Sequence, residues 1–200
     1  MIDEHYYSPR PPRGKLRLIL DSVAGIQLKL YTSSGVFSSS RIDPGTRLLL
    51  EHLVVPPEGA VLDLGAGIGV IGIFVAKANP RLTIYMSDVN RRALELARLN
   101  ARANNVEERV RVVESDVYDG LRGLRFAAVY SNPPLSAGWR VVERMILEAP
   151  GVLEDEGFMQ AVFARGERRA IELGSRVFES VEVLKRKSGY AVLLFRRPSR

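Results

Sequence analysis

The chain has 200 residues, of which 46% are hydrophobic and 26% are charged, as is typical of one folded α/β domain. It contains no cysteine and only two histidines, so disulfides, zinc ribbons and thiol chemistry are excluded and we expect no metal site. No apolar run is long enough for a membrane span and no leader pattern is visible, so we expect a cytoplasmic protein with no membrane partner, whereas the net charge of +6 suits a polyanion.

The first segment, residues 1–14, predicts an irregular arm because it is rich in proline and poor in apolar side chains. We expect a single domain over 15–200, with an N-terminal hairpin, loop and helix (15–58) and a core (59–200). Basic residues gather near both ends of the chain and would form one patch for a polyanion if the ends meet. They are Arg10, Arg13, Lys15, Arg17, Lys185, Arg186, Lys187, Arg196, Arg197 and Arg200.

Two apolar runs, 16–20 and 26–31, predict the strands of the hairpin because polar residues and a glycine separate them. Phe37 stands in the polar stretch that follows, where it is either a core plug or a lid over a ligand or base. Asp43, followed by a proline, predicts the N-cap of a helix that extends to about residue 53.

The most prominent stretch is an apolar strand, 61–64, that runs through a glycine-rich corner into an apolar helix, 70–78. The corner contains Gly65, Ala66, Gly67 and Gly69, and glycines let both the backbone turn and a ligand approach. Asp63 precedes it and would repel a phosphate, so a ligand with an amine or sulfonium is favoured over a dinucleotide. An ordinary tight corner without a ligand remains the alternative.

Two further strands also end near an acid. The run 82–88 ends in Asp88, at a spacing from the glycine corner that is typical of a carboxylate that binds both hydroxyls of a ribose. An amphipathic helix is expected over 90–104, followed by a strand at 110–113. Asp116 comes just after that strand and is either an acceptor for an adenine amino group or a cap of the next turn.

Asn132, Pro133 and Pro134 follow the next strand, 126–130, and form the most specific motif of the chain. The two prolines remove backbone donors and make a stiff turn, which leaves carbonyl oxygens uncommitted beside the glycine corner. An amide oxygen and a backbone carbonyl suit a planar amino group, such as the exocyclic amine of a base or a glutamine amide. The same acceptors stabilise positive charge that develops on that nitrogen, although a purely structural turn is the alternative.

The remaining chain alternates helices and strands and then ends in a strand pair. This order predicts an α/β fold with a mainly parallel sheet, helices on both faces and an antiparallel C-terminal strand. The expected helices are 139–149 and 167–173, and the expected strands are 157–163, 177–185 and 190–195.

Taken together, these motifs resemble those of class I S-adenosylmethionine-dependent methyltransferases that act on amino nitrogens. The stretch 35–50 is similar to the small methyltransferase-domain family, whose best-known members methylate guanine N2 in small-subunit ribosomal RNA, and the compact form resembles its archaeal single-domain branch. The resemblance covers about residues 16–197 and implies a Rossmann-like fold with a seven-stranded sheet. S-adenosylmethionine is the cofactor that it implies.

The resemblance also implies a role for each motif. Cofactor binding would fall to Asp63, Gly65, Ala66, Gly67, Gly69, Asp88, Val89, Asp116, Val117 and Asn132, and the target amine would be held by Asn132, Pro133 and Pro134. Bacterial relatives carry an aromatic residue after the two prolines, where this chain has Leu135 and Ser136. Leu135, Phe37 or Trp139 is therefore expected to contact the base instead.

We therefore expect an N-methyltransferase for an RNA base, with guanine N2 of ribosomal RNA as the first target and transfer RNA as a further substrate. Adenine N6 and a release-factor glutamine are the alternatives within the same chemistry, and a non-catalytic module that binds the cofactor or RNA is the alternative of another class. A dehydrogenase is disfavoured because the turn is Gly-x-Gly-x-Gly and not Gly-x-Gly-x-x-Gly.

Overall fold

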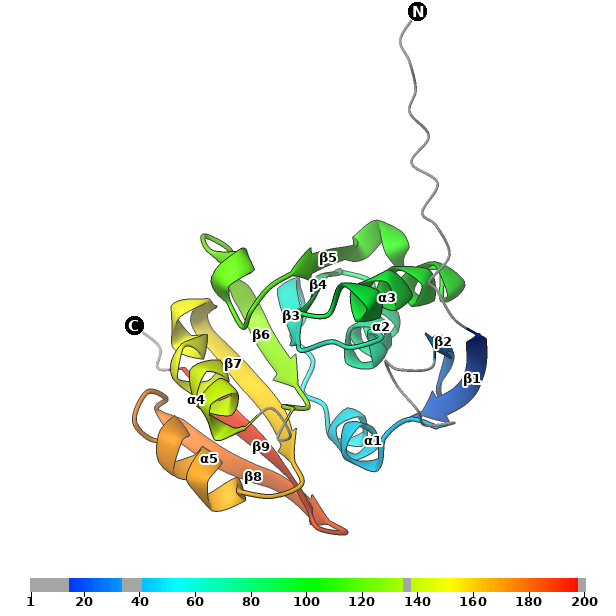
Figure 1. Ribbon diagram of the computed structural model, residues 1–200. Coiled ribbons are helices and arrows are strands. Elements are labelled where there is room, and N and C mark those ends of the chain that lie inside the picture. Colours follow the sequence, from blue (N-terminus) through cyan, green and yellow to red (C-terminus); the bar gives the residue numbers. More distant parts are fainter. Residues whose placement is uncertain (1–14, 34–40, 135–137, 198–200) are drawn as a thin grey trace, which may run out of the picture.

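A seven-stranded sheet forms the centre of this computed structural model, which describes residues 15–33, 41–134 and 138–197 (Figure 1). Five strands that are adjacent in the sheet pair in parallel. Of the two remaining strands, the inner one is antiparallel to both of its neighbours. This confirms the predicted mainly parallel sheet. In spatial order the strands are β5 (Val110–Glu114), β4 (Leu82–Asp88), β3 (Gly59–Leu64), β6 (Phe126–Ser131), β7 (Leu153–Phe163), β9 (Tyr190–Arg196) and β8 (Ser180–Lys187).

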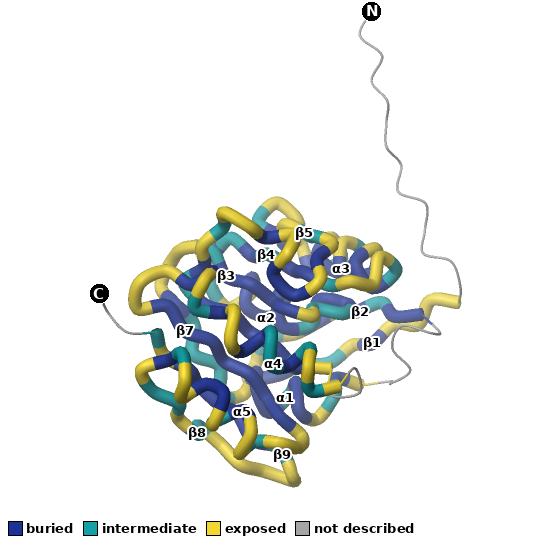
Figure 2. The backbone as a smooth tube through the Cα atoms, turned by 60° about the vertical axis from the view of Figure 1, so that its left-hand side comes forward, coloured by how far each residue is buried: buried dark blue, intermediate teal, exposed yellow. Residues whose placement is uncertain are grey.

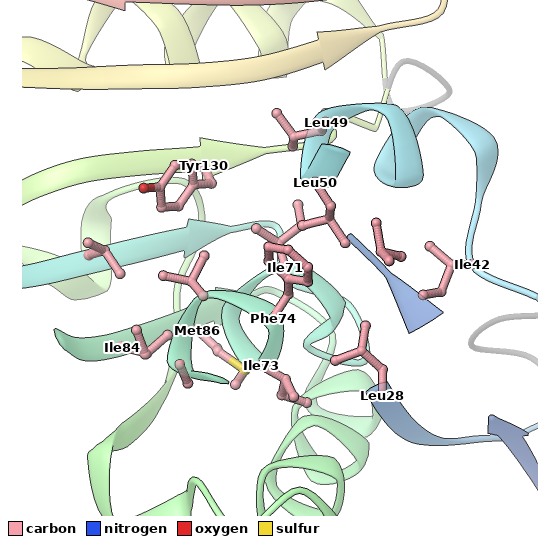
Figure 3. Close-up of a cluster of buried hydrophobic side chains, with 14 of the residues drawn as sticks. Leu28, Ile42, Leu49, Leu50, Ile71, Ile73, Phe74, Ile84, Met86 and Tyr130 are labelled. Carbon is pink, nitrogen blue, oxygen red and sulfur yellow. The ribbon is translucent and has the colours of Figure 1, made fainter. Parts of the chain in front are cut away.

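Helices cover both faces of the sheet, as predicted. They are α1 (Pro44–Glu51), α2 (Val70–Ala78), α3 (Arg91–Ala103), α4 (Trp139–Leu147) and α5 (Glu167–Gly174), with short 3-10 turns at Glu107–Arg109, Asp119–Leu121 and Ala149–Gly151. Apolar side chains of α1, α2 and α3 pack on one face in a cluster that includes Leu49, Phe74 and Tyr130 (Figure 3). Side chains of α4 and α5 form a second cluster on the other face, which includes Ile146 and Leu173.

The N-terminal hairpin is a separate two-stranded sheet, formed by β1 (Leu16–Val23) and β2 (Ile26–Ser33). It packs on α2 and α3, and two buried asparagines, Asn100 of α3 and its C-cap Asn104, fix it there. Asn104 accepts from the Lys29 N–H at 3.1 Å and donates to the Lys29 carbonyl at 2.7 Å. These bonds imitate strand pairing. They satisfy backbone groups of β2 that do not pair with β1.

β7 begins at Leu153, four residues before the predicted start at Gly157. The register with β6 shifts between Phe126 and Ala128, and Glu156 has a φ of 63° within this irregularity. A Cβ atom on Gly157 would lie 2.9 Å from the Glu154 carbonyl oxygen, so the tight path there requires glycine. The acidic, exposed residues before Gly157 lack the apolar pattern of a buried strand, which explains the difference.

β8 begins at Ser180 and not at the predicted residue 177. The N–H groups of Val177 and Phe178 both bond to the Gly174 carbonyl in a turn after α5, at 3.0 and 2.8 Å, and are not available for strand pairing. Figure 2 shows that the central strands are buried, whereas the turn between β8 and β9 is exposed. None of the helices in the described ranges is long and apolar enough to cross a membrane.

Candidate active site

The carboxyl ends of β3, β4 and β6 meet at one edge of the sheet, and most of the predicted site residues lie there. Leu64 at the end of β3 pairs with Ser87 of β4. From the other side, the Ser131 hydroxyl at the end of β6 donates to the Leu64 carbonyl at 2.8 Å. The glycine loop, residues 65–69, leaves β3 at this point and leads into α2.

The glycine loop requires glycine for two different reasons. All three of its glycines have positive φ, with 71° at Gly65, 55° at Gly67 and 87° at Gly69. A Cβ atom on Gly69 would lie 2.7 Å from the Met86 sulfur, so this glycine is needed for packing. A Cβ atom on Gly65 or Gly67 would meet nothing within 4 Å. These two glycines therefore border open space, into which a ligand can approach the backbone.

Asp63 is a buried carboxylate with one oxygen left unused. Its side chain is 1% exposed, and Oδ2 accepts the Gly72 N–H at 2.8 Å. Within the described part of the chain, Oδ1 is buried and has no hydrogen-bond partner. Burial raises the pKa of Asp63 to about 7, the Gly72 N–H opposes this rise, and the nearby charge of Asp88 adds to it. An unpaired carboxylate oxygen in this position favours a ligand that brings a cation or a hydrogen-bond donor.

Asp88 joins the end of β4 to the glycine loop. One carboxylate oxygen accepts the Gly67 N–H at 2.9 Å, and the other accepts the Asn90 N–H at 2.8 Å. Each oxygen keeps a further lone pair, so the carboxylate can also accept hydroxyl groups. Val89, the next residue, is 63% exposed, which makes it an apolar surface at the mouth of the site. The structure thus brings together the predicted residues Asp63, Asp88, Val89 and the glycine loop.

Asn132 lies just after β6 and is oriented by α1. Its side-chain nitrogen donates to Asp43 Oδ2 at 3.0 Å and to Thr46 Oγ1 at 2.9 Å. Because the amide nitrogen is committed in this way, the amide oxygen is the atom left to accept a hydrogen bond. Pro133 is buried and Pro134 is exposed.

Asp116 and Val117 lie after β5, as predicted. The carboxylate of Asp116 pairs with Arg144 of α4 at 3.1 Å, and the side chain is 62% exposed. Val117 is buried and has a φ of 52°. The sequence did not indicate the ion pair with Arg144, since the two residues lie on separate elements. Adenine recognition by Asp116 stays a prediction.

The three residues predicted to contact the base differ in what the structure describes. Phe37 and Leu135 lie outside the described residues. Trp139, the first residue of α4, is half-buried, and the Arg169 guanidinium lies 4.8 Å from the centre of its ring. A Cβ atom on Gly166 would lie 1.9 Å from Trp139 Cζ2, so the ring also packs closely on the loop before α5. Part of the ring is thus used for packing, and stacking on a base stays a prediction.

Comparison with known families identifies the fold's relatives. Residues 27–194 match the model of the family described as "Methyltransferase small domain". The chain belongs to this family. This confirms the resemblance that the glycine loop and the Asn-Pro-Pro turn indicated.

The relatives of this chain differ from one another in length. An uncharacterized protein of Bacillus subtilis, YbxB, is 33% identical over 197 residues, which cover 96% of this chain and 98% of that protein. The "Ribosomal RNA small subunit methyltransferase C" of Hamiltonella defensa is 37% identical over 174 residues, covering 85% of this chain and 50% of that protein. The chain therefore spans about half the length of the ribosomal RNA methyltransferases that it matches.

Two solved structures superpose well on this chain. The T. thermophilus 16S rRNA N2 G1207 methyltransferase, in complex with AdoMet and guanosine, superposes with a TM-score of 0.82 and 25% identity, over 94% of this chain and 52% of that chain. A methyltransferase from Pyrococcus furiosus has a TM-score of 0.71 and 21% identity, over 86% and 89% of the two chains, and shares the fold.

Two features of this candidate site were not predicted. Asp43 was predicted only as the cap of α1, and its bond to Asn132 joins elements that are distant in sequence. Asn100 of α3 donates to the Ile68 carbonyl in the glycine loop at 2.9 Å and was assigned no role. The sequence offered one signal for Asn100, namely an asparagine at a position of an amphipathic helix that is expected to be buried. A buried amide must find hydrogen-bond partners, so a structural role could have been expected.

Proposed function

We propose that this chain is an S-adenosylmethionine-dependent methyltransferase that acts on the exocyclic amine of an RNA base, with guanine N2 of ribosomal RNA as its target. The observation that carries the proposal is the orientation of Asn132, whose amide oxygen is left as an acceptor by the bonds from its nitrogen to Asp43 and Thr46. The names of the ribosomal RNA methyltransferases support the choice of guanine, as does the guanosine in the T. thermophilus complex.

The residues at the sheet edge fit S-adenosylmethionine. The unpartnered Oδ1 of Asp63 suits the cationic methionine end, and the open space at Gly65 and Gly67 lets that end approach the backbone. Asp88 offers lone pairs to the ribose hydroxyls, and Val89 offers an exposed apolar surface to the adenine. When bound, the cofactor supplies an electrophilic methyl group on a sulfonium sulfur.

The Asn-Pro-Pro turn would position the amine. The lone pair of an exocyclic amine is delocalised into the base, so the nitrogen is a weak nucleophile and depends on orientation. The amide oxygen of Asn132 and the Pro133 carbonyl each accept one N–H and leave one face of the nitrogen toward the methyl carbon. Transfer would form the nitrogen–carbon bond as the carbon–sulfur bond of the bound cofactor breaks, with the electron pair of that bond left on sulfur. The two acceptors stabilise the positive charge until one N–H proton passes to solvent.

The direct test is methylation of deproteinised small-subunit ribosomal RNA with labelled S-adenosylmethionine, followed by mass spectrometry of the nucleosides. We expect N2-methylguanosine, and we expect Asn132→Ala to lower the rate by about 100-fold or more while binding of S-adenosylhomocysteine is kept. A control is Asn105→Gly, since Asn105 is exposed in the turn after α3 and has a φ of 57°, which glycine adopts without strain. N6-methyladenosine as the product would assign the adenine alternative, and equal rates for wild type and Asn132→Ala would remove the catalytic role.

Methylation of a release factor without methylation of RNA would assign the glutamine alternative. Binding of S-adenosylhomocysteine without methylation of either substrate would assign the non-catalytic module. The cytoplasmic location stays a prediction, as do the absence of a metal and the division into an N-terminal segment and a core.

A further inference from the structure

A pocket of about 620 Å³ lies beyond the carboxyl end of β7, and methyl transfer as proposed above does not use it. Its walls are residues 163–168, from the end of β7 into the start of α5, and residues 186–191, from the end of β8 through the turn into the start of β9. Figure 1 shows this turn at the bottom of the molecule. We call this cavity the β7–β9 pocket.

The β7–β9 pocket carries an excess of positive charge. Four cationic side chains line it, Arg165, Arg168, Arg186 and Lys187, against the carboxylate of Glu167. Glu167 forms an ion pair with Arg186. Within the described ranges, the other three cations form no ion pair, and all three are exposed. Four positive charges less one negative charge leave an excess of three on a concave surface, which suits a polyanion.

The β7–β9 pocket adjoins the Asn-Pro-Pro turn through the sheet. Ser131 at the end of β6 pairs with Ala161 of β7, so the two strands end at the same edge. Residues 132–134 continue from β6, and residues 164–166 continue from β7 into the pocket wall. Trp139, just after the Asn-Pro-Pro segment, packs on Gly166 of that wall.

The amino end of α1 forms a second connection. Asp43 and Thr46 hold the side chain of Asn132. Gly45, between them, packs on the Tyr190 ring of the β7–β9 pocket, since a Cβ atom there would lie 2.7 Å from Tyr190 Cε1. A smaller pocket of about 140 Å³, lined by α1 residues together with Lys187 and Tyr190, extends along the same junction. One short helix thus touches both the candidate acceptor and the cationic wall.

We propose that the β7–β9 pocket binds the phosphate backbone of the RNA strand that carries the target base, an inference that rests on the proposed function. A base can reach Asn132 only when it is unpaired or turned out of its helix, and its strand then continues past the site. Arg165, Arg168 and Lys187 neutralise phosphates of this continuing strand and fix its position, without reading its sequence. RNA is favoured over an acidic protein segment because its phosphates follow one another regularly along the strand beside the base.

The test compares two triple variants with the same change in net charge. Arg165→Ala/Arg168→Ala/Lys187→Ala removes the three cations of the β7–β9 pocket that form no ion pair with a described residue and leaves Arg186, which is paired with Glu167. Arg81→Ala/Arg102→Ala/Arg125→Ala removes three exposed arginines near the opposite edge of the sheet, at the start of β4, the end of α3 and the start of β6. Affinity for a fluorescein-labelled single-stranded RNA of about 20 nucleotides is measured by anisotropy over a series of salt concentrations.

We expect the pocket variant to bind this RNA about tenfold or more weakly than wild type. The slope of log affinity against log salt should fall by about 2, as three lost contacts to single-stranded RNA require. The control variant should change less in both quantities, and both variants should bind S-adenosylhomocysteine as wild type does.

Equal losses in the two variants would assign RNA binding to diffuse surface charge and would overturn the pocket proposal. So would wild-type affinity in the pocket variant. If wild type methylates RNA while the pocket variant binds and methylates it normally, the proposed function stands and the pocket proposal fails. If wild type neither binds nor methylates RNA, both proposals fail, and tight binding of polyglutamate in that case would assign the β7–β9 pocket to an acidic protein.

Discussion

The carboxylate of Asp43 lies 3.0 Å from the side-chain nitrogen of Asn132, although the two residues are 89 positions apart in the chain. The same carboxylate oxygen accepts the Thr46 N–H at 2.9 Å and thereby caps α1. One group therefore begins a helix and orients the amide that we propose as the acceptor for the target amine. The hydroxyl of Thr46 completes the orientation with a second bond to Asn132 at 2.9 Å.

Replacement of Thr46 tests this orientation. Thr46→Val keeps the shape of the buried side chain but removes the oxygen that accepts from Asn132, so the amide is held by Asp43 alone. We expect kcat for RNA methylation to fall about tenfold, as loss of one hydrogen bond that positions a reacting group predicts, while KM for S-adenosylmethionine stays unchanged. Thr46→Ser keeps the hydroxyl and should restore kcat. A valine variant as active as wild type would show that Asp43 suffices.

The two roles of Asp43 show what the sequence could predict. Its role as a helix cap could be predicted, whereas its contact with Asn132 could not. Capping depends on residues three apart, and strands and helices depend on local apolar periodicity, so both could be predicted. The bond to Asn132 depends on how α1 packs on β7, the strand next to β6, which no local pattern encodes. The glycine loop and Asp63 were predicted as neighbours because they are contiguous, whereas the ion pair of Asp116 with Arg144 required the fold.

Asp63 should make the stability of the cofactor-free protein depend on pH. Burial raises the pKa of this carboxyl to about 7 from its ordinary value of 3.8, so the folded protein retains a proton that the unfolded chain releases. The contribution is therefore fully present below about pH 4 and is lost as pH rises through about 7. Between about pH 5 and about pH 8 we expect wild type to lose roughly 1–3 kcal/mol relative to Asp63→Asn, which cannot ionise.

Urea unfolding at several pH values measures this difference, with the variant serving as the reference for all other titrating groups. Asparagine keeps an oxygen for the Gly72 N–H, so the variant should fold. Parallel pH profiles for the two proteins would mean that Asp63 is ionised throughout this range, and that its buried oxygen is stabilised by a group that the described contacts do not include.

Asn100 should couple the hairpin to the glycine loop. Its oxygen accepts the Tyr31 N–H, and its nitrogen donates to the carbonyls of Tyr31 and Ile68 at 3.0 and 2.9 Å. We expect Asn100→Ala to destabilise the protein by about 2–3 kcal/mol, because buried backbone groups lose their partners. We also expect it to weaken S-adenosylhomocysteine binding severalfold, because the loop loses an anchor.

Asn104→Ala is the matched control, since Asn104 bonds to Lys29 of the same strand and to the Asn100 carbonyl but not to the glycine loop. It should cost similar stability and leave binding of S-adenosylhomocysteine unchanged. Calorimetric titration separates the two effects. If both variants bind S-adenosylhomocysteine equally more weakly than wild type, the loss results from loosening of the hairpin as a whole and not from loss of the bond to Ile68.

The contact between Gly166 and Trp139 gives a prediction that fluorescence can follow, since Trp139 is the one tryptophan of the chain. Gly166→Ala forces a side chain into a φ of 76° and into the ring, whereas Gly189→Ala meets only the strain of a φ of 82°, with nothing within 4 Å of the new atom. We expect about 1 kcal/mol of destabilisation at Gly189 and about 2–4 kcal/mol at Gly166, measured by urea unfolding. The emission maximum of Trp139 should shift to longer wavelength in the Gly166 variant alone, because the displaced ring becomes more exposed. Unchanged emission in that variant, with equal destabilisation at both positions, would mean that the loop before α5 yields and the ring does not.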